Sequence, residues 1–189
     1  MKYLLYSSIG IYLGMHFIAC NDPYVEKTVT VTEQAIKDTA IKIIPAIPHD
    51  TAIIVIDTKD QAPGNIVNFA KTLIGVPYKY ASTDPALGFD CSGFITYVFN
   101  HFKIQVPRSS VDFTNLGKTV NLENAKQGDL ILFTGTDSTI NVVGHMGIIT
   151  ENVDTLKFIH STSGKAYGVT ITPLNNYYKR RFVKIIDIF

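Results

Sequence analysis

The sequence predicts an α+β domain in which N-terminal helices pack on an antiparallel sheet of about five to six strands. Two observations predict this fold. Between residues 64 and 116 the apolar residues recur at helical spacing, whereas after residue 128 the apolar runs are short, rich in β-branched residues and separated by turn residues. Helices followed by consecutive strands are typical of helices packed on one sheet. With 46% hydrophobic and 17% charged residues, the composition also excludes a largely disordered chain.

The first helix is predicted from Asn65, its candidate cap, to the segment Gly75-Val76-Pro77. A second helix begins at Asp90 or Cys91, after a turn-rich loop over residues 81–88, and Pro107 closes it. A shorter helical turn follows from Ser109 to Leu116. The apolar faces of the two helices are Ile66, Phe69, Ala70 and Leu73, and then Ile95, Val98, Phe99 and Phe102. The predicted strands are 130–133, 146–149, 158–160, 169–171 and 183–189.

Residues 1–19 are predicted to be a secretory signal peptide. The run from Leu4 to Ala19 has no Asp, Glu, Lys or Arg, and its sixteen residues fall short of the roughly 20 that a membrane-spanning helix needs. Cys20 follows the small residue Ala19 directly, which resembles the lipobox of bacterial lipoproteins. That resemblance implies lipid on Cys20 and anchoring to a bacterial cell membrane, inner or outer. An ordinary signal peptide or an uncleaved anchor, with Cys20 incidental, is the alternative.

The remaining chain divides into a predicted tether over residues 20–63 and one domain over residues 64–189. In the tether, Pro45, Pro48 and Pro63 interrupt the apolar runs, so we expect no second domain there. The net charge is +1, from 17 Lys and Arg against 16 Asp and Glu. This balance is unlike the basic face of a nucleic-acid-binding domain, so we expect no nucleic-acid partner. We also expect a monomer.

Cys91 is the candidate nucleophile because it lies where a loop becomes a helix. Unpaired backbone N–H groups and the positive end of the helix dipole favour a thiolate there, so we expect a lowered thiol pKa. The neighbouring Asp90 opposes that effect. The alternative is a buried thiol with a structural role only.

The candidate partners of the thiol are His145 and His160, which lie on two different predicted strands. If those strands are antiparallel neighbours, one imidazole acts as the base and the other orients it. His101 is excluded, because it lies about 15 Å along the helix from the thiol. His16 and His49 fall in the signal peptide and the tether. Two histidines without HExxH or CxxC spacing leave a zinc ligand set short, so no metal or other cofactor is expected.

Six segments together resemble the NlpC-type cell-wall endopeptidases, which are papain-like cysteine peptidases of bacteria. The resemblance covers about residues 64–189, essentially the whole predicted domain. In chain order the segments are Gly75-Val76-Pro77-Tyr78, Asp90-Cys91-Ser92-Gly93-Phe94, Val106-Pro107-Arg108-Ser109-Ser110, Gly128-Asp129-Leu130, Gly144-His145-Met146-Gly147-Ile148 and Ile159-His160-Ser161.

The resemblance implies a role for each matching residue. Cys91 is the nucleophile, His145 the general base and then acid, and His160 the orienting third member. Tyr78 donates its hydroxyl to the oxyanion.

Four further residues are implied to bind substrate. Asp90, Ser92 and Ser110 hold the free amine end of a stem peptide, as in some family members. Arg108 pairs either with a substrate carboxylate or with Asp129.

The activity that the resemblance implies is hydrolysis of peptidoglycan stem peptides or muropeptides, between the γ-carboxyl of D-glutamate and diaminopimelate. Two other readings stay open: a wall-binding lipoprotein without catalysis, and a related papain-like amidase or acyltransferase.

Overall fold

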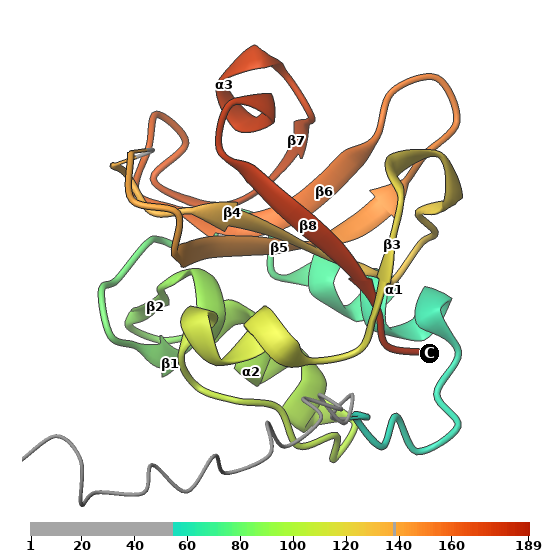
Figure 1. The fold of residues 1–189 in the computed structure, drawn as a ribbon. Coiled ribbons are helices and arrows are strands. Elements are labelled where there is room, and N and C mark those ends of the chain that lie inside the picture. The colour runs from blue at the N-terminus through green and yellow to red at the C-terminus, as the bar shows by residue number, and fades with distance from the viewer. Residues whose placement is uncertain (1–54, 138) are drawn as a thin grey trace, which may run out of the picture. The chain divides into compact units, whose positions relative to one another are not determined.

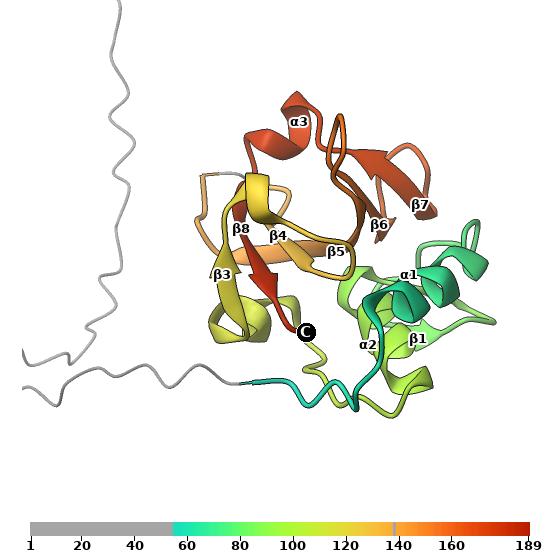
Figure 2. The same cartoon turned by 90° about the vertical axis from the view of Figure 1, so that its right-hand side faces the viewer.

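The computed structural model describes residues 55–137 and 139–189. The predicted signal peptide, Cys20 and most of the predicted tether lie outside these residues. The domain is built on a six-stranded antiparallel sheet in the order β3-β8-β4-β5-β6-β7, with α1 and α2 on one face and α3 on the other (Figures 1 and 2). The predicted papain-like α+β fold is therefore confirmed.

The first helix, α1 (Pro63–Thr72), begins two residues before the predicted cap, Asn65. Pro63 occupies its first turn, where the missing N–H of proline costs no hydrogen bond. Ile56 precedes this helix and is buried in the same core, although it falls in the predicted tether.

The second helix, α2 (Cys91–His101), begins as predicted but ends well before Pro107. Lys103 has a φ of 60°, the left-handed conformation that usually requires glycine. The N–H of Ile104 then donates to the carbonyl of Phe99 at 3.1 Å, and the N–H of Lys103 donates to that of Asn100. These two bonds form a Schellman motif, which ends the helix without a proline.

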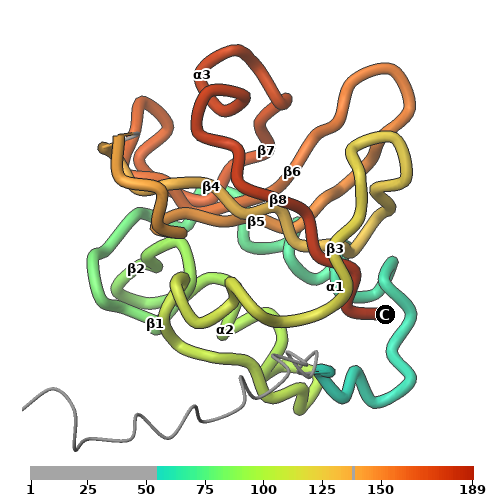
Figure 3. Tube along the Cα trace, viewed as in Figure 1, coloured from blue at the N-terminus to red at the C-terminus, as the bar shows by residue number. Residues whose placement is uncertain are grey.

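All five predicted strands are present. The ends of four differ from the prediction by at most two residues, whereas β5 begins three residues earlier and ends two residues later than predicted. They are β4 (Leu130–Thr134), β5 (Val143–Glu151), β6 (Lys157–Thr162), β7 (Gly168–Pro173) and β8 (Phe182–Asp187). The predicted turn after α2 is the 3-10 helix η2 (Ser110–Asn115). Elements that were not predicted are the hairpin of β1 (Thr83–Asp84) and β2 (Gly88–Phe89), β3 (Lys118–Val120), η3 (Leu122–Asn124) and α3 (Asn176–Lys179). Figure 3 traces the chain through its helices into the sheet, where β8 lies between β3 and β4.

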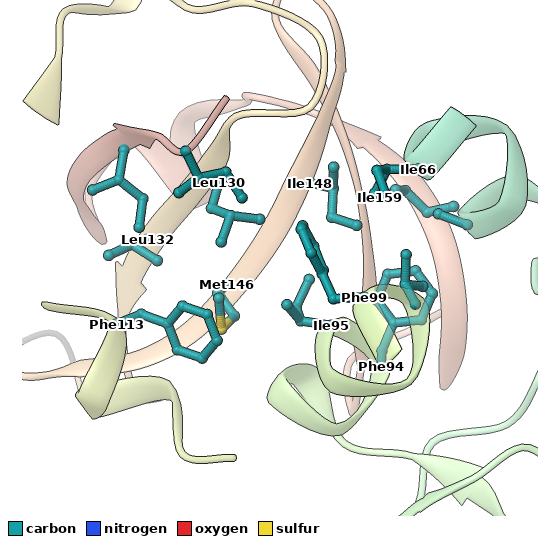
Figure 4. Close-up of a cluster of buried hydrophobic side chains, with 14 of the residues drawn as sticks. Ile66, Phe94, Ile95, Phe99, Phe113, Leu130, Leu132, Met146, Ile148 and Ile159 are labelled. Atoms are coloured by element: carbon teal, nitrogen blue, oxygen red, sulfur yellow. The ribbon is translucent and has the colours of Figure 1, made fainter. Parts of the chain in front are cut away.

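The alternation of side chains along β4 divides the core into two clusters. Leu130 and Leu132 pack on the side of α2, where they share a cluster with its residue Phe99 and with Met146 of β5 (Figure 4). The intervening residues of β4 belong to a second cluster with α3 and the segment before it. The sheet is therefore buried on both faces, and the two clusters hold α2 and the central strands in fixed positions.

Within residues 55–137 and 139–189, no helix is both long and apolar enough to cross a membrane.

Candidate active site

The start of α2 is fixed by Asp90 and Gly93. The Asp90 carboxylate accepts a hydrogen bond from the N–H of Gly93 at 2.6 Å, as an N-cap residue does. The N–H of Asp90 donates to the carbonyl of Ser82, which ties the helix start to the loop before it. A Cβ on Gly93 would lie 2.1 Å from that same carbonyl oxygen, so only glycine permits this approach. Together these contacts place Cys91 as the first residue of the helix.

The two candidate histidines lie side by side on neighbouring strands, His145 on β5 and His160 on β6. Nε2 of His145 lies 2.8 Å from Nδ1 of His160, and both side chains are buried. Nε2 of His160 lies 2.9 Å from the hydroxyl of Thr172 on β7, which extends the chain of hydrogen bonds across a third strand. With Nε2 of His145 engaged in this way, Nδ1 is the nitrogen left to receive a proton.

The thiol contacts the backbone near the start of β5, one residue before His145. Sγ of Cys91 lies 3.8 Å from the carbonyl oxygen of Gly144, the residue before His145. Ser161, which follows His160, donates its hydroxyl to the carbonyl of Phe89 at 2.7 Å. This buried bond connects β6, which carries His160, to Phe89, two residues before the thiol. It therefore fixes the position of Cys91 relative to His160.

A cavity of about 830 Å³ opens over Cys91 and His145. Tyr78 lines it from the loop that follows α1, and burial, followed by the negative charges that Cys91 carries when ionised and that Asp90 carries, raises the pKa of its phenol. The phenol therefore stays protonated as a hydrogen-bond donor at neutral pH. The other side of the cavity is formed by the β6–β7 loop and by residues in and just after α3.

The expected lowering of the thiol pKa is wrong in direction. Burial, followed by the negative charge of Asp90, raises the pKa of the Cys91 thiol to about 11. The backbone N–H groups at the helix start do lower it, as anticipated, but these two effects outweigh them.

The pKa values of the two histidines are shifted in the opposite direction, downward. Burial, then the charge of His160 and that of Arg181, lowers the pKa of His145 well below its usual value. Burial and Arg181 lower the pKa of His160 to about 3. At neutral pH the resting site is therefore a neutral thiol beside two neutral imidazoles, and the thiolate forms only when the proton moves to the base.

The predicted substrate-binding residues form a different network from the expected one. Arg108 forms an ion pair with Asp90 through Nη2 at 2.5 Å, and its Nη1 donates to Asp90 and to the hydroxyl of Ser92, each at 3.0 Å. Two partners had been left open for Arg108, a substrate carboxylate or Asp129. Arg108 does not pair with Asp129, whose carboxylate accepts from a backbone N–H of its own turn. Within residues 55–137 and 139–189, no hydrogen bond joins Ser110 to this network. The Asp90 carboxylate is thus already paired with a protein cation.

Three residues of the site were missed by the sequence analysis: Ser161, Thr172 and Arg181. Ser161 stood in a recognised motif, but its bond to the helix segment spans 72 residues of sequence. Thr172 is one of two threonines that alternate along β7, and nothing in the sequence distinguishes it. In the described part of the chain, no cluster of three or more His, Cys, Asp and Glu side chains is arranged to hold a metal ion.

Comparison with protein families matches residues 75–187 to the NlpC/P60 family. The chain is 36% identical over 124 residues to a gamma-DL-glutamyl hydrolase of Bacillus subtilis, covering 66% of this chain and 29% of that one. It is 33% identical over 119 residues to a gamma-D-glutamyl-L-lysine dipeptidyl-peptidase of Bacillus cereus, covering 63% and 34%. The chain therefore spans about a third of the length of these relatives.

Among solved structures, an NlpC/P60 family protein of Bacillus cereus superposes with a TM-score of 0.60 at 31% identity. The superposition covers 68% of this chain and 40% of that one. The residues matched to the family, 75–187, include the thiol and the two histidines.

Proposed function

Because the chain belongs to the NlpC/P60 family, we propose that it is a cysteine peptidase that hydrolyses the stem peptides of peptidoglycan. One observation carries the proposal: Cys91, at a helix start, shares a cavity with His145, which is hydrogen-bonded to His160. A nucleophile, a base and a group that orients the base are the parts that acyl transfer requires.

The first half of the reaction forms an acyl-enzyme. The proton of the Cys91 thiol moves to Nδ1 of His145 as Sγ attacks the peptide carbonyl carbon. The backbone N–H of Cys91, which has no acceptor within the helix, and the Tyr78 hydroxyl donate to the oxyanion. The carbon–nitrogen bond then breaks, and His145 returns the proton to the leaving amine.

The second half regenerates the thiol. His145 takes a proton from a water molecule, which attacks the thioester carbon, and then protonates the departing sulfur. His160 serves both halves by accepting the Nε2–H of His145, which leaves Nδ1 as the basic nitrogen. In this tautomer His160 donates its own Nε2–H to Thr172, so the hydroxyl completes the alignment.

We propose that the bond cut is the one between the γ-carboxyl of D-glutamate and diaminopimelate. Support comes from the two relatives named above, whose names both specify a γ-glutamyl bond. Purified muropeptides digested with the full-length chain, and products identified by mass, test both levels of the proposal. Products cut at another position would contradict the proposed choice of bond. No product, or equal product from Cys91→Ala, would contradict the peptidase and favour a wall-binding protein or an amidase of another substrate.

The proposal also includes a lipid anchor on Cys20, which would hold the enzyme at the membrane surface. Its support is the sequence alone, namely the uncharged run that ends at Ala19-Cys20. The domain would then act on wall material within reach of the membrane.

A further inference from the structure

The charges that line the cavity are of one sign. Its lining residues include Lys165 and Arg181, and no Asp or Glu side chain is among them. Its other polar lining is mostly hydroxyl groups, such as those of Thr162 and Ser163. Cations and hydroxyl donors without a carboxylate are the groups that bind an anion.

Arg181 is a buried cation whose protein partners are all neutral. Its side chain lies at the end of α3 and donates to the carbonyls of Gly135 and Thr134 and to the Tyr177 hydroxyl. These bonds use three of its five N–H groups. Among residues 55–137 and 139–189, no carboxylate forms an ion pair with it. A buried charge without a counterion is costly, and an anion in the cavity would offset that cost.

Lys165 differs from Arg181 in being exposed. It lies in the loop between β6 and β7, and the ion pairs of the described residues do not include it. Its ammonium group is therefore free to reach a ligand over the cavity, while the guanidinium of Arg181 is held in place by the backbone.

We propose that this cavity contains a carboxylate-binding subsite beside Cys91, formed by Lys165 and Arg181. The inference rests on the proposed function for the identity of the ligand. A stem peptide linked through the γ-carboxyl of glutamate keeps a free α-carboxylate next to the bond to be cut. Amidation of that carboxylate removes its charge, so the subsite would distinguish free-acid stems from amidated ones.

A pair of thiol reagents tests the subsite without any peptide. Iodoacetate and iodoacetamide both alkylate sulfur with loss of iodide and differ in having a carboxylate or a neutral amide. The full-length chain is treated with each reagent, and the rate of alkylation at Cys91 is taken from the fraction of its peptide that carries the added mass at successive times. The ratio of the iodoacetate rate to the iodoacetamide rate then reports the local charge, because a change in thiol pKa affects both rates alike.

We expect Lys165→Gln to lower this ratio about three- to tenfold, the effect of one unit charge at close range in a partly solvated site. Lys165→Glu should lower it further, and Lys165→Arg should keep it. The matched control is Lys103→Gln, an exposed lysine beyond the end of α2 that is opposite the thiol, and the helix between them is about 15 Å long. A ratio unchanged in Lys165→Gln and Lys165→Glu would overturn the subsite.

Stem peptides with a free or amidated glutamate α-carboxylate extend the test to substrate. Lys165→Gln should raise KM for the free acid and leave the amidated peptide unaffected. If the reagent ratio falls but neither peptide is cut, the subsite stands and the proposed function is wrong. If both peptides are cut and Lys165→Gln changes their KM values equally, the subsite does not bind this carboxylate and the inference is wrong.

Discussion

Replacing Gly93 by alanine tests whether the loop before α2 really fixes the position of the thiol. The new Cβ would lie 2.1 Å from the carbonyl oxygen of Ser82 and 3.0 Å from Oδ1 of Asp90. Cβ atoms essentially never approach closer than 3.0 Å, so the loop and the helix start must separate by about 1 Å. Overpacking of this kind costs about 1–3 kcal/mol. A displacement of about 1 Å in a reacting group costs roughly 100-fold in rate.

The matched control is Gly64→Ala, the same substitution in the first turn of α1. Its Cβ would meet only Oε1 of Gln127, at an ordinary 3.6 Å, so the change should stabilise by about 0.5–1 kcal/mol. Denaturant unfolding followed by circular dichroism gives both free energies, and hydrolysis of a stem peptide gives the rates. If Gly93→Ala unfolds and reacts like Gly64→Ala, the helix start is not held by this loop and the reasoning is refuted.

Three further predictions concern the base, the thiol and the anchor. His160→Asn and His160→Gln should keep more stem-peptide turnover than His160→Ala, because they retain a hydrogen-bonding group beside His145. Turnover of Thr172→Val should lie between these two levels, because it removes only the last bond of the chain. Equal loss of turnover in all four variants would refute the orienting role of His160. Alkylation of Cys91 by iodoacetamide should keep rising above pH 8.5, since its pKa is raised to about 11, and Asp90→Asn should move the profile to lower pH by removing a negative charge; a wild-type midpoint below 8.5 would contradict this. Cys20→Ala should abolish acylation and release the protein from membranes, and an unprocessed, unmodified N-terminus in wild-type intact mass would argue against the anchor.

The ends of α2 illustrate what the sequence could and could not predict. Its start was predictable because Asp90 is an N-cap residue and an apolar period follows it. Its end was not, because Lys103 adopts a left-handed conformation that the sequence signals only when glycine is present. The buried side chain of Ile104 packs into the core there, so tertiary burial outweighs the backbone preference of lysine.

In the candidate site, too, some features could be predicted from the sequence and others could not. The pairing of His145 and His160 could be anticipated from two neighbouring strands, because it needs only their order and period. The ion pair of Arg108 with Asp90 could not, since it depends on where a loop 18 residues away folds back. The raised thiol pKa followed from burial, which a sequence does not give at a single position.

The central claim is that Cys91 forms a covalent acyl-enzyme with His145 as the base. The most direct test is acid quenching of a reaction between the full-length chain and a stem peptide, followed by intact mass and peptide mapping. The account predicts an added mass equal to the acyl part of the substrate, located on Cys91, and almost none of it in His145→Ala. Stem-peptide hydrolysis by Cys91→Ala at the wild-type rate, or an adduct located on another residue, would contradict it.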